Sequence, residues 1–301
     1  MKLAVSLILV GLITLAALVW HYPSNRDFAL NNPSWNGLSD FVSDFNASAV
    51  NSITPPPIPP SNSVLIMIPY TPFADPELQA LDNWLSAGGT LILMDDYGYG
   101  NQLLEYLDVS PRFTNIPLLD PIINNINPSF PTISHFTSYN APGDNGSIVL
   151  NHACSLDGVN DEYVIAESSR FSFLDQNNNS VWDEGEPHGP FTVAGSMVYE
   201  SGRLVLLSDP SILIMLDIVD NKDFLETMII PSDENYEIFI DESHLPRSTL
   251  ENTQEIMNIV RANLMTPHGT IILLLGIIAL VLLPTWRKYD WSFIRLRRDR
   301  T

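Results

Sequence analysis

Two stretches near the ends of the chain are apolar throughout and carry no charged residue. The first covers residues 3–20. At about 1.5 Å per residue, a helix of this length is just long enough to cross about 30 Å of hydrocarbon. A cleaved signal peptide is the alternative, but the apolar run continues past the small residues Ala16 and Ala17 to Trp20. This continuation favours a membrane anchor over residues 1–20.

The second stretch covers residues 269–285, and Trp286, Arg287 and Lys288 follow it directly. A buried core helix could be equally apolar. An apolar run closed by an aromatic and two basic residues is typical of a transmembrane helix, and we predict one over residues 268–286.

The last segment, residues 287–301, is basic, and Lys2 adds a weaker basic signal at the other end. Basic flanks face the cytoplasm in most membrane proteins. We therefore expect a two-pass protein of the cell membrane with both termini in the cytoplasm. Residues 21–267 would then form a domain outside.

Within this central segment, apolar runs separated by helical patterns predict a strand–helix–strand unit. Residues 64–68 and 90–94 are continuously apolar, which is typical of strands buried on both faces. Asp75 is placed to cap a helix between them, with Pro76 at its first position. Strands joined by a helix in this way are parallel, so the pattern predicts the α/β class.

The remaining elements follow the same logic. Further helices are expected near residues 38–45, 101–107, 221–230 and 249–264, and further strands near residues 147–150, 163–166, 192–199, 203–207 and 237–240. A Pro-rich connector occupies residues 55–60, and Ser201-Gly202 predicts a hairpin turn. Residues 111–142 lack any sustained period, so we predict an inserted region over about 109–190 that is β-rich and partly a surface loop.

Charge and cysteine content narrow the possible partners. The chain has 35 acidic and 14 basic residues, and the central segment alone holds 33 acids against 7 bases, a net charge of −26. Such a surface repels phosphate, which excludes a nucleic-acid partner. The single cysteine, Cys154, permits no internal disulfide, which for a domain outside the membrane favours a prokaryotic envelope.

Several motifs together resemble a known family. They are Asn-Pro-Ser-Trp-Asn-Gly at 32–37, Leu-Asp-Asn-Trp-Leu-Ser-Ala-Gly-Gly-Thr-Leu at 81–91, Gly-Arg-Leu-Val-Leu-Leu-Ser-Asp at 202–209 and Ile-Asp-Glu-Ser-His at 240–244. With an apolar helix at each end, this order resembles domain-of-unknown-function family 4350. The resemblance implies a membrane-tethered, flavodoxin-like domain similar to class I glutamine amidotransferases, and it implies no established activity.

Thiol catalysis does not fit the residues. Amidotransferase-like enzymes carry a nucleophilic Cys on a sharp strand-to-helix turn with flanking glycines. After the second predicted strand, this turn holds Asp95-Asp96-Tyr97-Gly98 instead. Cys154 has no flanking glycine, so we expect it to be inert.

Acidic residues follow three of the predicted strands. They are Asp95, Asp96, Asp209 and Asp241, with His244 close behind. Ligands of open α/β sheets bind beyond the carboxyl ends of the strands, so these side chains predict a crevice for a metal or a polar ligand such as a glycan. The alternative is that Asp209 and Asp241 cap the segments that follow them.

The segment 175–186 has the spacing of a calcium-binding loop. Its expected ligands are Asp175, Asn177, Asn179, the Val181 carbonyl, Asp183 and Glu186. Ser180 replaces the usual glycine of the turn, and the residues before the loop predict a strand rather than a helix. We expect a structural Ca²⁺ site of low affinity, with an Asn-rich acidic turn as the alternative.

Taken together, the sequence favours a non-catalytic binding or scaffolding subunit of an envelope assembly, with the lipid bilayer and other membrane or envelope proteins as partners. The alternative is an outward-facing hydrolase that uses a metal or an acid–base pair at the carboxyl edge of the sheet. The use of the Asp95, Asp96 and Asp209 side chains discriminates between the two. Carboxylates that converge on an open crevice favour the enzyme, and carboxylates used as caps favour the scaffold.

Overall fold

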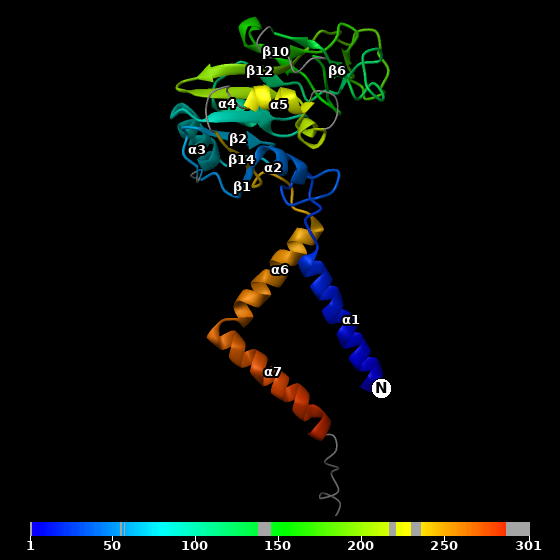
Figure 1. Ribbon diagram of the computed structural model, residues 1–301, viewed down its shortest axis with the longest axis vertical. Helices are drawn as coiled ribbons and strands as arrows, with labels where there is room; N and C mark the ends of the chain where they lie inside the picture. Colours follow the sequence, from blue (N-terminus) through cyan, green and yellow to red (C-terminus); the bar gives the residue numbers. More distant parts are fainter. Residues whose placement is uncertain are drawn as a thin grey trace, which may run out of the picture. The chain divides into compact units, whose positions relative to one another are not determined.

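The computed structural model describes residues 2–54, 56, 58–137, 146–216, 221–229 and 236–286. The chain forms two compact units, which we describe separately. One comprises Pro23–Arg247, and the other comprises Met1–Tyr22 with Ser248–Thr301. Figure 1 shows the strands of the larger unit and the long helices of the smaller one. Every candidate site residue identified from the sequence belongs to the larger unit.

A mixed β-sheet forms the centre of the larger unit. In the described part of the chain its main path runs β1 (Ser48–Val50), β14 (Glu237–Asp241), β2 (Ser63–Met67), β3 (Thr90–Met94), β13 (Gly202–Leu207), β12 (Thr192–Tyr199), β10 (Val164–Glu167) and β7 (His135–Phe136). Strands β1 to β13 along this path are parallel, and β12, β10 and β7 continue the sheet antiparallel. The predicted α/β class with a mostly parallel sheet and flanking helices is confirmed.

Helices flank this sheet as the apolar spacing predicted. They are α2 (Ser39–Phe45), α3 (Asp75–Ser86), α4 (Gly100–Tyr106) and α5 (Asn221–Ile229). Asp75 was predicted to be the N-cap of α3, but Ala74 takes that position and Asp75 lies in the first turn. The reason is Glu77, whose carboxylate accepts a hydrogen bond from the Ala74 N–H at 2.7 Å and stabilises the helix start without an N-cap side chain.

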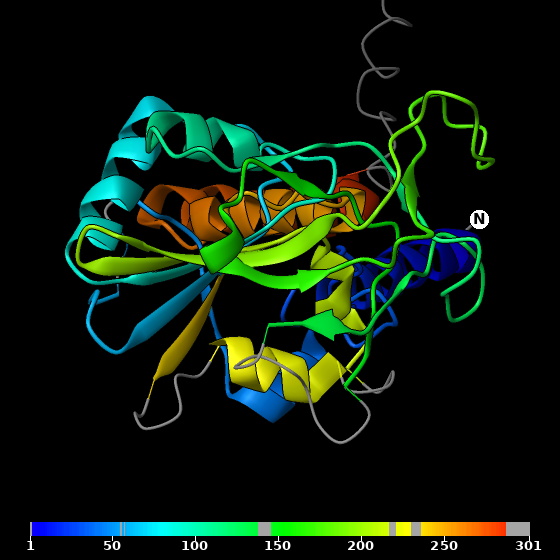
Figure 2. The same cartoon turned by 90° about the horizontal axis from the view of Figure 1, so that it is seen from above.

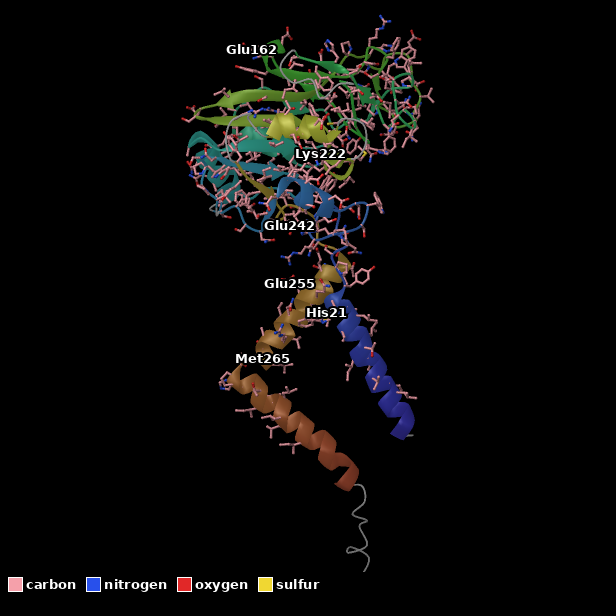
Figure 3. The ribbon with its side chains drawn as sticks, in the orientation of Figure 1. His21, Glu162, Lys222, Glu242, Glu255 and Met265 are labelled. Atoms are coloured by element: carbon pink, nitrogen blue, oxygen red, sulfur yellow. The ribbon has the colours of Figure 1, made fainter. Side chains whose placement is uncertain are left out.

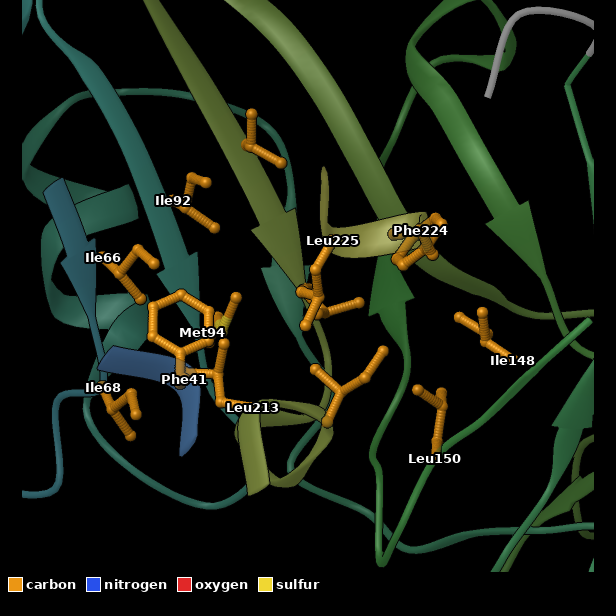
Figure 4. Packing of buried hydrophobic residues seen from close by; sticks show 14 of the residues in the cluster. Phe41, Ile66, Ile68, Ile92, Met94, Ile148, Leu150, Leu213, Phe224 and Leu225 are labelled. Atoms are coloured by element: carbon orange, nitrogen blue, oxygen red, sulfur yellow. The ribbon is translucent and has the colours of Figure 1, made fainter. Parts of the chain in front are cut away.

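The two faces of the sheet are covered by different helices, which explains the uninterrupted apolar runs (Figure 2). On β2, Ile66 belongs to the same buried cluster as Phe41 of α2 and Phe224 of α5. The preceding residue, Leu65, points to the other face and belongs to a second buried cluster, which includes Trp84 of α3. Figure 4 shows Phe41, Ile66 and Phe224 within the first of these clusters. The result is a sheet buried between two helical layers.

The predicted hairpin is confirmed, but its turn is formed by Glu200 and Ser201, one residue earlier than the predicted Ser201-Gly202, and Gly202 begins β13. Strands β12 and β13 pair antiparallel, with Tyr199 opposite Gly202. A Cβ on Gly202 would lie 2.1 Å from the Leu85 carbonyl oxygen, so only glycine lets the end of α3 approach this turn.

The inserted region between α4 and β12 is β-rich, as predicted, but its strands are very short. The pairs are β4 (Arg112–Phe113) with β9 (Leu156–Asp157), β5 (Leu118–Leu119) with β11 (Phe173–Leu174), and β6 (Thr132–Ile133) with β8 (Ile148–Val149). The segment predicted as a surface loop at 111–142 is at the surface only in part, because Ile122 and Ile126 are exposed whereas Leu118 and Ile133 are fully buried. Strands of two residues are too short to give the period-two pattern by which strands are recognised.

The smaller unit contains α1 (Lys2–His21), α6 (Thr249–Leu264) and α7 (Pro267–Trp286). The Gln254 side chain donates hydrogen bonds to the Val19 and Tyr22 carbonyls, and the Arg261 guanidinium lies 5.5 Å from the centre of the Trp20 ring. Helix α6 therefore associates with α1. Figure 3 labels His21 at the end of α1 and Met265 at the end of α6.

None of the helices, as far as their residues are described, is by itself both long and apolar enough to cross a membrane. Helix α6 and the segment Pro267–Gly276 of α7 pass that test only as a pair, with a bend of 93° between them. The basic tail predicted at 287–301 lies outside the described residues.

Candidate functional site

The carboxyl ends of β3 and β13 bring three of the predicted acidic residues together. The two strands are parallel neighbours, with Met94 opposite Leu207. The Asp95 N–H continues this pairing by donating to the Leu207 carbonyl at 3.1 Å. Asp95 and Asp96 therefore lie beside Asp209, at the edge where the sequence predicted a crevice.

Asp95 is fully buried, and both of its carboxylate oxygens are used by the following loop. One oxygen accepts a hydrogen bond from the Gly98 N–H and the other from the Gly100 N–H, each at 2.6 Å. A Cβ at either glycine would lie 2.7 Å from these oxygens, so glycine is required for so close an approach. Burial raises the pKa of Asp95 to about 6, although the two amides counteract part of the shift.

Asp209 caps the 3₁₀ helix Pro210–Ile214, as the alternative from the sequence predicted. One carboxylate oxygen accepts from the Ser211 N–H and the other from the Asn151 N–H, each at 2.7 Å. Complete burial raises the pKa of Asp209 to about 7. Its carboxylate thus ties the end of β13 to the segment that carries Asn151.

Asp96 is also buried, and its main partner was not recognised from the sequence. The Tyr70 hydroxyl donates to one oxygen of Asp96 at 3.2 Å, and the Tyr97 N–H donates to the other at 2.7 Å. Burial raises the pKa of Asp96 and, together with the neighbouring Asp96 charge, raises the pKa of Tyr70. Tyr70 follows β2, which is the neighbour of β3 in the sheet. Its place after this strand was the feature of the sequence that could have predicted its contact with Asp96.

Asp241 and His244 form a separate pair instead of joining the other acids. The Asp241 carboxylate is 2.6 Å from His244 Nδ1 and also accepts a hydrogen bond from the Ser243 N–H. His244 Nε2 is 3.5 Å from the Glu77 carboxylate, and the Phe73 ring packs on the imidazole. The acidic residues predicted to line one crevice therefore form two hydrogen-bonded groups, and β2 lies between β14 and β3 in the sheet.

Cys154 is fully buried behind the Asp95 group. Its thiol lies 3.6 Å from the Asp95 carbonyl oxygen, and burial raises the pKa of the thiol far above its ordinary value. A thiol held protonated and away from solvent is a poor nucleophile. The expectation of an inert cysteine agrees with this environment.

In front of this edge lies a cavity of about 430 Å³. Its lining residues come from four segments of the chain and are Tyr97, Asn115, Ile116, Pro117, His152, Asp175, Gln176 and Asn178. The sequence suggested neither this convergence nor a role for Asn115, because the four segments are far apart and mostly irregular. Two of the lining residues, Asp175 and Gln176, begin the predicted calcium loop.

The predicted calcium loop forms a hydrogen-bonded turn. Asp175 accepts from the backbone N–H groups of Asn179 and Ser180, and the Asn177 and Asn179 amides both donate to one oxygen of Asp183, at 2.7 and 2.6 Å. Glu186 accepts from the Gln176 and Asp183 N–H groups. The Asn179 side-chain oxygen accepts from the Val181 N–H. Over the described residues, no group of three or more His, Cys, Asp or Glu side chains is placed to hold a common metal ion.

The fold and this edge define an α/β protein whose strand-end carboxylates bind backbone amides of the adjoining loops. The chain belongs to the family described as domain of unknown function, DUF4350, which it matches over residues 31–229. No curated protein matches the sequence.

Several solved structures are distant matches. The "mmIFT52 N-terminal domain" is 13% identical, with a TM-score of 0.44 over 56% of this chain and 79% of that one. A β-galactosidase from Bacillus circulans sp. alkalophilus is 11% identical, with a TM-score of 0.33 over 55% of this chain and 22% of the enzyme. The exo-β-1,4-mannosidase Op5Man5 from Opitutaceae bacterium strain TAV5 is 10% identical, with a TM-score of 0.28 over 58% and 24%. The chain thus spans less than a quarter of the length of these two glycosidases.

Proposed function

We propose that this protein is a membrane-anchored, non-catalytic binding or scaffolding subunit of an envelope assembly, with its α/β unit outside the membrane. The observation that carries the proposal is the use of Asp95 and Asp209. Each spends both carboxylate oxygens on backbone N–H groups. Carboxylates bound in this way stabilise loops, and both side chains are fully buried, which keeps them from a substrate in solution.

The membrane part of the proposal rests on the two terminal helices. Helices α1 and α7 have 20 residues each, so each is about 30 Å long at 1.5 Å per residue. The basic residues after α7 favour a cytoplasmic C-terminus. The acidic α/β unit would then face the outside, where we expect it to bind other envelope proteins.

A hydrolase at the same edge is the second candidate, and one observation favours it. The pKa of Asp95 is raised to about 6 and that of Asp209 to about 7, the range in which carboxyl groups act as general acids. Both carboxyl groups are fully buried, however, and both oxygens of each accept hydrogen bonds from backbone amides, which favours a structural role for the two residues.

Co-purification from native membranes tests the scaffold. The full chain, extracted in detergent with an affinity tag, is expected to bring down the same envelope proteins from independent preparations. The matched bait is Val198→Asp, which places a charge on a β12 side chain that is 74% exposed and tests whether this exposed position takes part in binding. The hydrolase would be favoured by two results together: the chain is recovered without partners, and the purified chain has a hydrolytic activity that Asp209→Asn abolishes.

Protease protection tests the orientation. Protease added to intact cells is expected to degrade the α/β unit and to spare an epitope tag placed after residue 301. Removal of the tag with an intact α/β unit would reverse the proposed topology.

We also propose that residues 175–186 hold a structural Ca²⁺. The donor set fits this ion, because it offers carboxylate, amide and carbonyl oxygens from one short segment. Two amides already converge on Asp183, and a half-turn of each would present its oxygen in place of its nitrogen. Bound Ca²⁺ would hold the loop closed against the β11 strand.

A further inference from the structure

The cavity in front of the β3 and β13 ends has the size of a site for a small ligand. Its volume is about 430 Å³, within the range of about 300–1,000 Å³ found for such sites. One side is formed by Tyr97, which follows β3. Residues 115–117, His152 and the start of the loop at 175 form the rest.

Backbone hydrogen bonds join the segments that form these walls. The Asp175 N–H donates to the Pro117 carbonyl at 2.9 Å, and the Leu118 N–H donates to the Ala153 carbonyl at 2.9 Å. The Cys154 N–H in turn donates to the Ser208 carbonyl at 3.1 Å, which connects the walls to the central sheet. The cavity is therefore preformed, and ligand binding would lose little free energy to the ordering of these segments.

Three of the residues that line the cavity have left-handed backbones although none is glycine. The φ angles are 54° at Asn115, 57° at His152 and 59° at Asn178. Such conformations are uncommon for residues with a side chain and concentrate at functional sites, where they direct side chains that a regular backbone would not. These backbones fix the directions in which the three side chains leave the loops around the cavity.

The polar groups of the lining are suited to hydroxyl groups. The side-chain amides of Asn115, Gln176 and Asn178 form no hydrogen bond with any described residue, and each offers both a donor and an acceptor. His152 binds the Asn151 side chain through Nδ1, which leaves Nε2 available. Burial and neighbouring acidic groups raise the pKa of Tyr97, so its hydroxyl stays protonated and can donate.

Charge around the cavity excludes anions. The lining contains no Lys or Arg. Asp96, Asp175 and Asp209 all lie close enough to act on the Tyr97 hydroxyl electrostatically. Phosphate or carboxylate ligands would be repelled, whereas a neutral ligand rich in hydroxyls would be matched by the amides and by the face of the Tyr97 ring.

We propose that this cavity, lined by Tyr97 and by the solvent-exposed side-chain amides of Asn115, Gln176 and Asn178, binds a neutral carbohydrate. The proposal deepens the binding role proposed above, on which it rests, by naming the class of ligand. A site of this size accommodates one or two sugar rings, with the ring of Tyr97 against one face.

Saturation-transfer NMR on the full chain tests the proposal. The chain is kept in a detergent without a sugar headgroup, and the probes are cellobiose, lactose, N,N′-diacetylchitobiose and the anion galacturonate. We expect saturation transfer to at least one neutral disaccharide and none to galacturonate. Failure of all three neutral probes, or preference for galacturonate, would overturn the proposal.

Two variants locate the binding. Tyr97→Ala is expected to weaken the affinity at least about tenfold, and Gln176→Ala to weaken it less. Tyr106→Ala removes a tyrosine of similar exposure, 44% against 41%, outside the lining and should keep wild-type affinity. Equal loss in Tyr97→Ala and Tyr106→Ala would contradict the site. Sugar binding and partner binding are measured on the same variants. A variant that no longer binds the sugar but still co-purifies with its partners would show that the scaffold role does not depend on the carbohydrate site.

Discussion

The Nδ1 atom of His244 lies 2.6 Å from the Asp241 carboxylate, and both side chains are buried. Asp241 ends β14, and the other ring nitrogen of His244 faces Glu77 in the first turn of α3. The imidazole therefore connects a strand to a helix through two carboxylates. Because Phe73 covers the ring, water cannot easily replace these contacts.

Replacement of His244 by Ala is expected to destabilise the α/β unit by about 2–3 kcal/mol. The reason is that the buried Asp241 carboxylate loses a charge-assisted partner and a cavity opens beside Phe73. Urea unfolding of the full chain in detergent, followed by tyrosine and tryptophan fluorescence, measures the change.

His135→Ala is the matched control for this prediction. His135 also pairs with a carboxylate, Glu167, at 2.8 Å, but its side chain is 73% exposed. We expect His135→Ala to lower the free energy of unfolding by less than about 1 kcal/mol. If the two variants lower the free energy of unfolding by similar amounts, burial of the His244–Asp241 pair does not contribute to stability.

The raised pKa values at the sheet edge predict a dependence of stability on pH. Burial places the pKa of Asp209 near 7 and that of Asp95 near 6, against about 3.9 in an unfolded chain. The folded state then binds these protons more tightly than the unfolded state. Their contribution to the free energy of unfolding is fully present below about pH 4 and is lost as the pH rises to about 7.

Asp209→Asn is expected to flatten the decline in the free energy of unfolding between pH 4.5 and 7. The difference in slope from wild type is at most about 1.4 kcal/mol per pH unit, the value for one proton. Urea titrations at several pH values measure the slope, and Asp157→Asn, at an exposed position, should leave it unchanged. A slope in Asp209→Asn equal to that of wild type would mean that Asp209 does not hold this proton.

The sequence predicted the central sheet well because each buried strand stands out on its own. The run at 90–94 is apolar at every position after Thr90, and the structure buries all five residues. Capping was also readable, since Asp209 precedes Pro210 and accepts from the Ser211 N–H as that order suggests. These features depend on residues close together in the chain.

The cavity could not be predicted in the same way. Tyr97, Asn115, His152 and Gln176 come from four segments whose association depends on strands of two residues and on single backbone hydrogen bonds. No periodic pattern marks such contacts. The alternation Gly98-Tyr99-Gly100 after Asp95 was the signal available in the sequence for a loop closed on a carboxylate.

Cys154 is expected to resist alkylation in the folded protein. Its side chain is fully buried and burial raises the pKa of its thiol, so the reactive thiolate is scarce. Iodoacetamide at pH 8 should label it more than about a hundredfold more slowly in the native state than in urea, as measured by mass spectrometry. Ser201→Cys, on the exposed β12–β13 turn, provides a thiol that should react rapidly in the same sample. Comparable rates at both positions in the native state would contradict the inert role.

Calcium is expected to stabilise the α/β unit through the loop at 175–186. Extracellular Ca²⁺ modules bind with dissociation constants of about 10⁻⁴–10⁻³ M. At 10 mM Ca²⁺ this corresponds to about 1.4–2.7 kcal/mol, or a rise of about 3–8 °C in Tm for a unit of this size. Differential scanning fluorimetry in Ca²⁺ and in EDTA measures the rise.

Two variants at adjacent positions separate a calcium site from an acidic turn. Asp183→Asn removes the carboxylate on which the Asn177 and Asn179 amides converge, and it should abolish the rise in Tm. Glu184→Gln removes an equal charge at a position that supplies no ligand in such loops and should preserve the rise. If Ca²⁺ leaves the wild-type Tm unchanged, or both variants lose the rise equally, the segment is an Asn-rich turn stabilised by its own hydrogen bonds.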